Sequence, residues 1–265
     1  MPYADLHVHT TRSDGCLELE AVPDAARRAG VAVVAVTDHD RLQPFDAPVV
    51  ERDGVTLING IELRVSTPAG QRVDLLGYGV DATPALEGLV EEIQRNRVER
   101  GQTIVDRVED RLGIDLGVTV EDGFGRPHVA RAIDAHPETA YDYGDAFEQL
   151  IGNGDPCYVP RDVPSFEYGL GALTASCRLV SLAHPLRYPD PKEAVALTAE
   201  PSLEAVERHY AYTREEVDHE LVDRAIERYG LLVTGGSDAH DDQLGITGLS
   251  RDEYEQLGIE EIPEK

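Results

Sequence analysis

Three apolar segments of the chain end in clusters of histidine and carboxylate residues, and this pattern limits the possible folds more than any other feature. The clusters lie at 7–9, 37–40 and 236–240, each directly after a run that predicts a strand. In a β/α barrel the carboxyl ends of the strands converge on one face, where the functional residues gather. Residues at i and i+2 of a strand point to the same side. His7 and His9 can therefore share one site, and so can Asp238 and His240.

The first 80 residues alternate between predicted strands and helices. A helix that ends at Gly30 precedes a β-branched run typical of a buried parallel strand. The full pattern predicts strands over 3–8, 31–36, 55–58 and 73–80, and helices over 17–29 and 44–51. Strand–helix–strand alternation is typical of a parallel sheet with helices outside it.

This alternation is interrupted in the middle of the chain. One or two long helices are expected over 84–111, and a stretch rich in Gly, Pro, Tyr and Asp follows to about 170. Strands over 179–183, 203–206 and 231–234 and a helix over 213–229 then restore the alternation. The expected organisation is an α/β barrel made of 1–82 and 172–265, with a mainly helical subdomain, 83–171, inserted into it.

Charge and hydropathy exclude several classes of protein. Acidic residues outnumber basic ones by 51 to 24, a net charge of −27, which argues against a basic grip on long nucleic acid. Mean hydropathy is −0.32, and the longest apolar run, Val31–Val36, is far shorter than a membrane span. The first residues lack the features of a signal peptide, and three widely spaced cysteines fit reduced thiols. A cytoplasmic location without membrane contact is expected.

Lysine is nearly absent, since Lys192 and Lys265 are the only two among the 24 basic residues. Two interpretations stay open, an ordinary acidic protein and a halophilic one adapted to high internal salt. Because counterions screen self-repulsion, we expect the melting temperature to be higher in molar KCl than in dilute buffer. A thermal melt across KCl concentrations measures this, and a flat or falling melting temperature would favour the ordinary interpretation.

The histidines point to metal binding. Six of the nine lie in compact motifs, and five of these six follow apolar strands. Buried imidazoles and carboxylates left without partners are costly, whereas mixed His and carboxylate donors without thiolate suit Zn²⁺, Mn²⁺ or Fe²⁺. The donors are too many for one ion. Two or three divalent ions per chain are expected, an arrangement used to hydrolyse phosphate esters.

The motifs together resemble the PHP (polymerase and histidinol phosphatase) superfamily. The resemblance is carried by Asp5-Leu6-His7-Val8-His9-Thr10, Ser13-Asp14-Gly15, Thr37-Asp38-His39-Asp40, Gly60-Ile61-Glu62, Ala183-His184-Pro185 and Gly236-Ser237-Asp238-Ala239-His240. Segments 125–131 and 158–160 resemble the branch that hydrolyses nucleoside 3′,5′-bisphosphates, some members of which trim short RNA from the 5′ end. The resemblance implies a distorted seven-stranded β/α barrel and a trinuclear metal centre.

The resemblance also implies which residues bind the ions. A first ion would take His7, His9, Glu62 and Asp238, and a second Asp14, His39 and His240. A third would share Glu62 and take His184 with Asp74, which stands where the family usually has His. The implied reaction is attack of a metal-bridging hydroxide on phosphorus, with His184 or Asp40 assisting the leaving group. Glu207 also matches a family position, and its role stays open between support of the site and structure.

Four basic residues are candidates for substrate binding. Arg126, His128, Arg131 and Arg187 can pair with phosphate oxygens; for Arg131 a structural role is equally open. Asn153 and Asp155 stand where relatives often carry basic residues, which again argues against long nucleic acid. The expected function is a phosphoric ester hydrolase acting on a small phosphorylated nucleotide. The alternatives are a histidinol-phosphate phosphatase and a non-catalytic metal-binding PHP module.

Overall fold

A computed structural model of the chain describes every residue except 122, 213–216 and 261–265. The chain divides into two compact units. The first unit consists of Met1–Val90 and Val163–Lys265, and the second unit is Glu91–Asp162. The predicted boundaries at 82/83 and 171/172 differ from these by several residues, and the assignment of the inserted segment to substrate binding remains a prediction.

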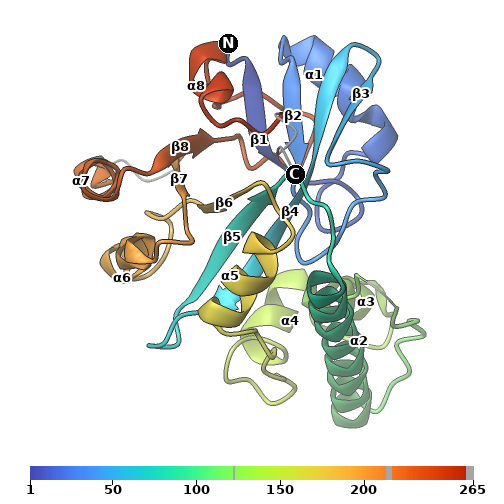
Figure 1. The fold of residues 1–265 in the computed structure, drawn as a ribbon. Helices are drawn as coiled ribbons and strands as arrows, with labels where there is room; N and C mark the ends of the chain where they lie inside the picture. Colours follow the sequence, from blue (N-terminus) through green and yellow to red (C-terminus); the bar gives the residue numbers. More distant parts are fainter. Residues whose placement is uncertain (122, 213–216, 261–265) are drawn as a thin grey trace. The chain divides into compact units, whose positions relative to one another are not determined.

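The first unit is built on one curled sheet (Figure 1). Its strands run in the spatial order β1-β2-β4-β5-β6-β7-β8, and β3 pairs with β4 outside this path. The strands are β1 (Ala4–Val8), β2 (Val33–Val36), β3 (Val49–Arg52), β4 (Val55–Ser66), β5 (Arg72–Tyr78), β6 (Leu179–Leu182), β7 (Ala205–His209) and β8 (Leu232–Gly235).

The two ends of the curled sheet meet at the site predicted from sequence. The His9 amide donates to the Ala239 carbonyl oxygen at 2.9 Å, and Val8 forms a parallel bridge with Ala239 just beyond β8. The interior is closely filled by apolar side chains such as Leu6, Ile58 and Leu76. The predicted α/β fold, a distorted barrel, is confirmed.

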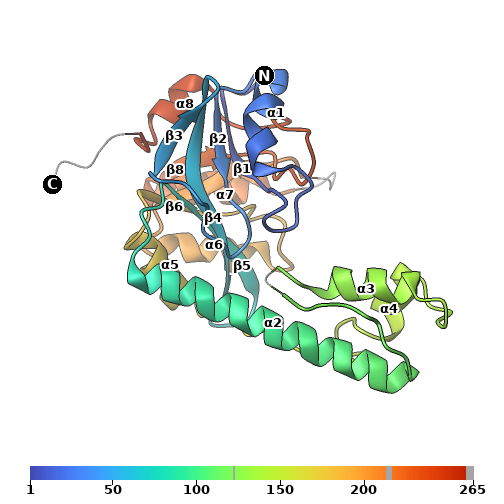
Figure 2. The same cartoon turned by 90° about the vertical axis from the view of Figure 1, so that its right-hand side faces the viewer.

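Short helices cover the sheet in the first unit, and the remaining helices belong wholly or partly to the second (Figure 2). Helix α1 ends where Gly30 adopts φ 71°, a left-handed conformation that glycine tolerates. The first unit contains the 3₁₀ turns Leu19–Ala21 and Leu197–Ala199 and the helices α1 (Val22–Ala29), α5 (Phe166–Thr174), α6 (Pro191–Ala196), α7 (His219–Tyr229) and α8 (Arg251–Glu255). Helix α2 (Pro84–Leu112) runs from the first unit into the second, which holds α3 (Arg126–Ala135) and α4 (Tyr143–Gln149).

The predicted helix over 44–51 is wrong, because part of this segment forms a hairpin. Strand β3 pairs antiparallel with β4, with Arg52 opposite Val55. The two residues between them, Asp53 and Gly54, have φ of 52° and 75°. Two successive left-handed residues form the tight turn that joins twisted antiparallel strands, and Asp-Gly is a favoured pair for it. The Asp53-Gly54 dipeptide is therefore the sequence signal for this hairpin.

The prediction of a parallel sheet is wrong for β5. This strand is antiparallel to both of its neighbours, β4 and β6. A parallel return would need a crossover of a dozen or more residues, whereas residues 67–71 alone connect β4 to β5. Strand β4 is also longer than predicted, because it continues from Ile58 to Ser66. The antiparallel return places the start of β5, with Asp74, beside the end of β4.

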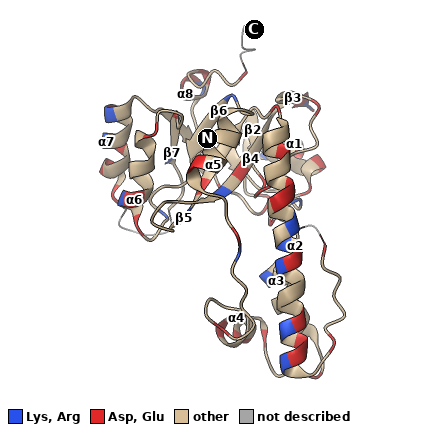
Figure 3. Cartoon of the chain, turned by 60° about the horizontal axis from the view of Figure 1, so that its bottom comes forward, with Lys and Arg blue, Asp and Glu red and all other residues tan. Residues whose placement is uncertain are grey.

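Other element boundaries shift by a few residues. The predicted helix over 17–29 begins at Val22 after a 3₁₀ turn. The helix expected over 213–229 is described from His219 onward, and 213–216 lie outside the described residues. Helix α2 is a single helix with charged residues of both signs along it (Figure 3). Within the described part of the chain, no helix is long and apolar enough to cross a bilayer.

The second unit has a hydrophobic core of its own. Side chains from the later turns of α2, from α3 and from α4 pack together, among them Ile104, Val108, Ile133 and Leu150. This core holds the start of α3, where Arg126 and His128 lie, against the rest of the unit.

Candidate metal centre

Strand β1 delivers two buried imidazoles to one place. His7 and His9 alternate with Leu6 and Val8, which join the apolar core. The Nε2 atoms of His7 and His9 lie 3.4 and 3.3 Å from Oε2 of Glu62. They also lie 3.4 and 3.1 Å from Oδ1 of Asp238. The residues predicted for the first ion are thus brought together.

A second group of donors shares His9 with the first. Asp14 Oδ1 lies 3.7 Å from His9 Nδ1 and 3.5 Å from His240 Nε2. Asp14 Oδ2 lies 3.7 Å from His39 Nε2. The structure brings together the three residues predicted for the second ion, Asp14, His39 and His240, and adds His9, whose ring stacks on that of His240 with centroids 4.4 Å apart. The sequence motif contained His9 but did not indicate that it faces both groups.

The donor atoms of the first group fit a divalent ion. Ligands held at about 2.1 Å around one ion stand roughly 3.0–3.4 Å apart in tetrahedral or octahedral geometry. The measured separations are close to this range. Moreover, Nε2 of His7, both ring nitrogens of His9 and Oε2 of Glu62 are buried without a hydrogen-bond partner among the described residues. Such atoms are costly unless something binds them.

Charge compensation holds the cluster together. Burial opposes the charged form of His9, but the nearby carboxylates of Asp238 and Glu62 outweigh it and raise the pKa of His9 to about 9. The pKa of Asp238 is lowered despite its burial, chiefly by His7 and His9. Imidazolium and carboxylate groups therefore stabilise each other, and a divalent ion that binds here must displace protons from the imidazoles.

Backbone strain is concentrated at the site. Four residues other than glycine have φ in the left-handed region among the described residues, and three of them are candidate site residues. These are Asp40 at 51°, His184 at 25° and Asp238 at 54°. Such conformations persist where surrounding contacts enforce them, and they cluster at functional sites.

Two buried carboxylates that do not face the centre hold its loops. Asp5 accepts hydrogen bonds from the amides of Ser237 and Gly245, both at 2.8 Å, which fixes the loop bearing Asp238 and His240. Asp38 accepts from the Thr10 amide at 2.8 Å and from the Ser13 hydroxyl, which fixes the loop bearing Asp14. Sequence reasoning placed both residues in the motifs but missed these roles.

Glu207 on β7 supports the centre from behind. Its Oε1 lies 3.0 Å from His7 Nδ1, and its Oε2 accepts the His184 amide at 2.7 Å. A carboxylate oxygen accepts, so Nδ1 of His7 is the donor in this contact, and Nε2 is the nitrogen left to bind an ion once its proton is displaced. The same carboxylate stabilises the strained backbone of His184. A histidine ligand oriented in this way is typical of metal sites.

Replacing Glu207 with Gln is expected to weaken Mn²⁺ binding roughly 10- to 100-fold with little change in fold. The amide of Gln has only one oxygen, so it cannot accept hydrogen bonds from both the His184 amide and Nδ1 of His7. If the amide NH₂ group faces Nδ1 of His7, the proton of this imidazole moves to Nε2, which faces the centre. Calorimetric titration with Mn²⁺ measures the affinity, and ¹⁵N NMR reports the protonated nitrogen of His7. Glu253→Gln, beside His209 outside the centre, is the control. Unchanged affinity in Glu207→Gln would contradict this role.

Other predicted residues of the first unit lie at the edge of the centre. Arg187 Nη1 donates to Asp238 Oδ2 at 2.9 Å, as does the Tyr210 hydroxyl. His184 Nε2 lies 3.0 Å from Glu62 Oε1. Asp40 is buried and its Oδ1 accepts the Arg64 amide at 3.0 Å. Tyr210 carried no sequence signal, because it lies one residue beyond β7 with no motif around it.

Asp74 lies close to Glu62 and His39, with donor atoms grouped within 4.8 Å. Its Oδ2 is 4.0 Å from His184 Nε2. Both of its oxygens, however, already accept from Arg64, at 2.7 Å from Nε and 2.8 Å from Nη2. The predicted ligand role of Asp74 therefore stays a prediction, and its competing partner is identified.

The remaining predicted substrate residues belong to the second unit. Arg126 Nη1 donates to the Ile151 carbonyl at 3.3 Å and to Asn153 Oδ1 at 3.2 Å, at the first turn of α3. The Arg126 guanidinium also lies 5.7 Å from the Phe147 ring centroid. His128 accepts the Gly125 amide through Nδ1 at 3.1 Å, which leaves its Nε2 available. Arg131 is exposed on α3, and Arg131 contributes to a lowered pKa of His128, after burial of that ring.

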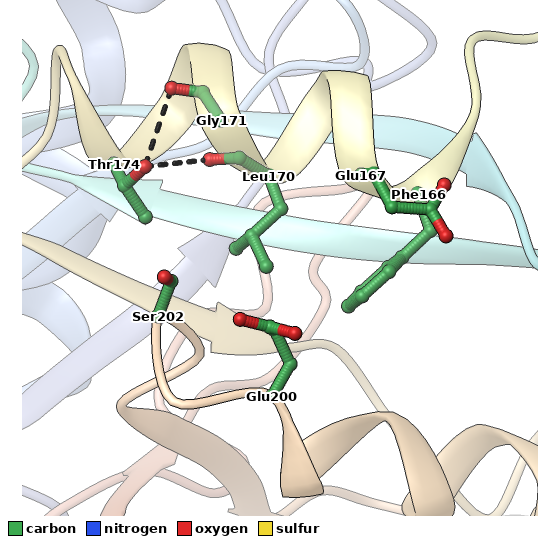
Figure 4. A pocket seen from close by; sticks show the side chains of 7 residues that line it. All are labelled: Phe166, Glu167, Leu170, Gly171, Thr174, Glu200 and Ser202. Carbon is green, nitrogen blue, oxygen red and sulfur yellow. Dashed lines mark hydrogen bonds between the residues drawn. The ribbon is translucent and has the colours of Figure 1, made fainter.

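A small cavity of about 210 Å³ lies elsewhere in the first unit, between α5 and residues 200–202 (Figure 4). It is lined by Phe166, Glu167, Leu170, Gly171, Thr174, Glu200 and Ser202. None of the predicted site residues lines this cavity, so it is separate from the metal centre.

The curled sheet brings buried imidazoles and carboxylates together, with donor atoms spaced for divalent ions. This fold and this site define a metal-dependent hydrolase of the α/β-barrel class. The chain belongs to the PHP domain family, whose family model matches residues 5–258. This confirms the resemblance that the sequence motifs indicated.

Similar proteins include two phosphoesterases, of which one acts on the expected class of substrate. The chain is 31% identical to a phosphoribosyl 1,2-cyclic phosphate 1,2-diphosphodiesterase of Eggerthella lenta, over 89% of this chain and 93% of that protein. It is 31% identical to a 3′,5′-nucleoside bisphosphate phosphatase of Chromobacterium violaceum, over 71% of this chain and 68% of that protein. A crystal structure from Bifidobacterium adolescentis matches the fold with a TM-score of 0.73 and 23% identity, covering 96% of this chain and 95% of the other.

Proposed function

We propose that this protein hydrolyses a phosphate monoester of a small nucleotide, of the nucleoside 3′,5′-bisphosphate type, with two or three divalent ions. The observation that carries the proposal is the pair of donor groups that share His9, with buried donor atoms that no described residue satisfies. The similarity to the C. violaceum bisphosphate phosphatase supports the substrate class. A small substrate also suits a chain with a net charge of −27, which repels long polyanions.

The roles of the residues follow from their positions. His7, His9, Glu62, Asp238, Asp14, His39 and His240 would hold ions, which in such centres lower the pKa of water and neutralise phosphoryl oxygens. Arg187 lies against Asp238 with more than half of its side chain exposed, so its free N–H groups can bind a phosphate oxygen. His184, beside Glu62, is proposed to donate a proton to the leaving oxygen, and Asp40 is the second candidate for this step.

A second candidate is hydrolysis of a cyclic phosphodiester of phosphoribose. It is favoured by one observation, the similarity to the E. lenta diphosphodiesterase, which extends over nearly the full length of both chains. Both reactions begin with attack of water on phosphorus, and they differ in the leaving oxygen. In hydrolysis of the bisphosphate, the leaving oxygen departs with the nucleotide, which separates from the phosphate. In opening of the cyclic ester, the leaving oxygen becomes a hydroxyl group on the same sugar that still carries the phosphate.

A substrate panel with Mn²⁺ separates these functions. The panel contains 3′-phosphoadenosine 5′-phosphate, phosphoribosyl 1,2-cyclic phosphate, histidinol phosphate and a short 5′-phosphorylated RNA, with kcat/KM measured for each. The highest value for the bisphosphate supports the proposal, and the highest value for the cyclic ester supports the second candidate. A preference for histidinol phosphate, or ion binding without turnover on any substrate, would contradict both and favour the alternatives named above.

Substitutions in the second unit test substrate recognition. Arg126→Ala and His128→Ala are expected to raise KM for the bisphosphate at least about tenfold and to change KM for an aryl phosphate little, because an aryl phosphate lacks the second phosphate. Steady-state kinetics on both substrates measure this. Arg107→Ala, which removes another arginine of the same unit, is the control. Equal losses on both substrates would assign Arg126 and His128 to structure.

A further inference from the structure

The register of two strands places a cation beside the centre. Strands β4 and β5 are antiparallel, and Arg64 lies directly opposite Asp74 in their ladder. The guanidinium reaches across with two parallel hydrogen bonds, Nε to Oδ1 at 2.7 Å and Nη2 to Oδ2 at 2.8 Å. Asp74 is almost fully buried. A bidentate pair of this kind uses both carboxylate oxygens and is among the strongest side-chain interactions.

This cation lies in a corner rich in negative charge. The Arg64 amide donates to Asp40 Oδ1 at 3.0 Å. Glu62 lies two residues before Arg64 on β4, and its Oε1 lies 3.0 Å from His184 Nε2. His184 Nε2 lies 4.0 Å from Asp74 Oδ2. Glu62, Asp74 and His184 are the residues to which the family resemblance assigned a third ion.

We propose that the guanidinium of Arg64 takes the place of the third ion, so that the centre holds two ions and one fixed arginine charge. The inference rests on the proposed function, since it presupposes the metal centre. A divalent ion bound to Asp74 would stand within a few ångströms of the guanidinium, and two like charges at such a separation repel strongly away from bulk water. The ion would also have to displace a bidentate pair whose cation cannot be deprotonated.

The arginine supplies part of what an ion would supply. About a third of its side chain is exposed, and the N–H groups not used by Asp74 can donate to a phosphate oxygen. A guanidinium neutralises charge and orients phosphate, but it does not lower the pKa of water. Arg64 is thus a binding residue for the phosphoryl group in a centre whose water activation depends on the two complete donor groups.

Metal content tests this inference. Wild type, Asp74→Asn and the control Asp223→Asn, which alters the comparable pair of Asp223 with Arg208 away from the centre, are saturated with Mn²⁺, desalted and analysed by mass spectrometry. We expect two ions per chain in all three. Three ions in wild type and two in Asp74→Asn would overturn the inference and leave the proposed function standing. No ions in any variant would overturn both.

Binding of inorganic phosphate gives a second measurement. In the Mn²⁺-loaded protein, Arg64→Met is expected to weaken phosphate binding about tenfold, Arg64→Lys less, and Arg208→Met not at all. Calorimetry measures the dissociation constants, and thermal melts confirm that each variant is folded. Equal phosphate affinity in Arg64→Met and wild type would overturn the role of Arg64 in binding the phosphoryl group.

Discussion

Glu62→Gln is expected to lower kcat/KM for phosphate release by about four orders of magnitude. Oε2 of Glu62 lies within 3.4 Å of the Nε2 atoms of both His7 and His9 and 2.9 Å from Nδ1 of His39. It therefore belongs to the first donor group and also contacts His39, a member of the second. The neutral amide keeps the shape of the side chain but removes the charge that an ion requires, so ion content should fall together with activity.

The fold should survive this substitution, because Ile61 and Leu63 on either side of Glu62 are fully buried and keep β4 in place. A circular-dichroism melt and metal analysis of the same sample separate loss of ions from loss of fold. Glu253→Gln is the matched control, since Glu253 also faces a histidine, His209, but lies outside the centre. Near wild-type turnover by a folded Glu62→Gln protein would remove Glu62 from the metal centre. His7→Ala, His39→Ala and Asp238→Ala are likewise expected to abolish hydrolysis while the fold stays largely intact.

The clustering of the strand-end residues could be predicted from the sequence because their placement depends on local geometry. Alternation along β1 and on to the next residue puts His7 and His9 on one side. Strand β2 runs parallel to β1, and a parallel bridge joins Val8 to Ala239 just beyond β8. No knowledge of distant contacts was needed. The same local reasoning identified Gly30 as the end of a helix.

Contacts that depend on the direction or register of a strand could not be predicted from the sequence. The pairing of Arg64 with Asp74 exists because β5 returns antiparallel to β4 in one register, and a shift of one residue would turn Asp74 to the other face. Glu207 lies in a short strand next to Arg208 and His209, so nothing in its spacing indicates that it contacts His7, 200 residues earlier. The Arg64–Asp74 pair and Glu207 thus contact the centre through long-range interactions that only the folded chain creates.

Removal of divalent ions is expected to abolish hydrolysis and to destabilise the protein at the same time. Without ions, the buried Nε2 atoms of His7 and His9 and Oε2 of Glu62 have no hydrogen-bond partner among the described residues. An ion that binds only the folded state stabilises it by about 2.7 kcal/mol at a concentration a hundredfold above its dissociation constant. For a chain of this size that corresponds to a melting temperature higher by roughly 5–10 °C.

The experiment compares protein treated with a chelator and desalted with the same protein after addition of Mn²⁺, Zn²⁺, Fe²⁺ or Mg²⁺. Activity and melting temperature should return together with the ion that the centre prefers. Glu62→Gln should show neither recovery, because it loses a carboxylate of the first donor group that also contacts His39 of the second. This result would link the stabilisation to the centre and not to general screening of the −27 charge. Because screening depends on ionic strength, matched KCl should raise the melting temperature of both proteins without restoring activity to either. Full activity in the chelated wild type would refute a metal-dependent reaction, and equal Mn²⁺ stabilisation of wild type and Glu62→Gln would place the stabilising ion outside this centre.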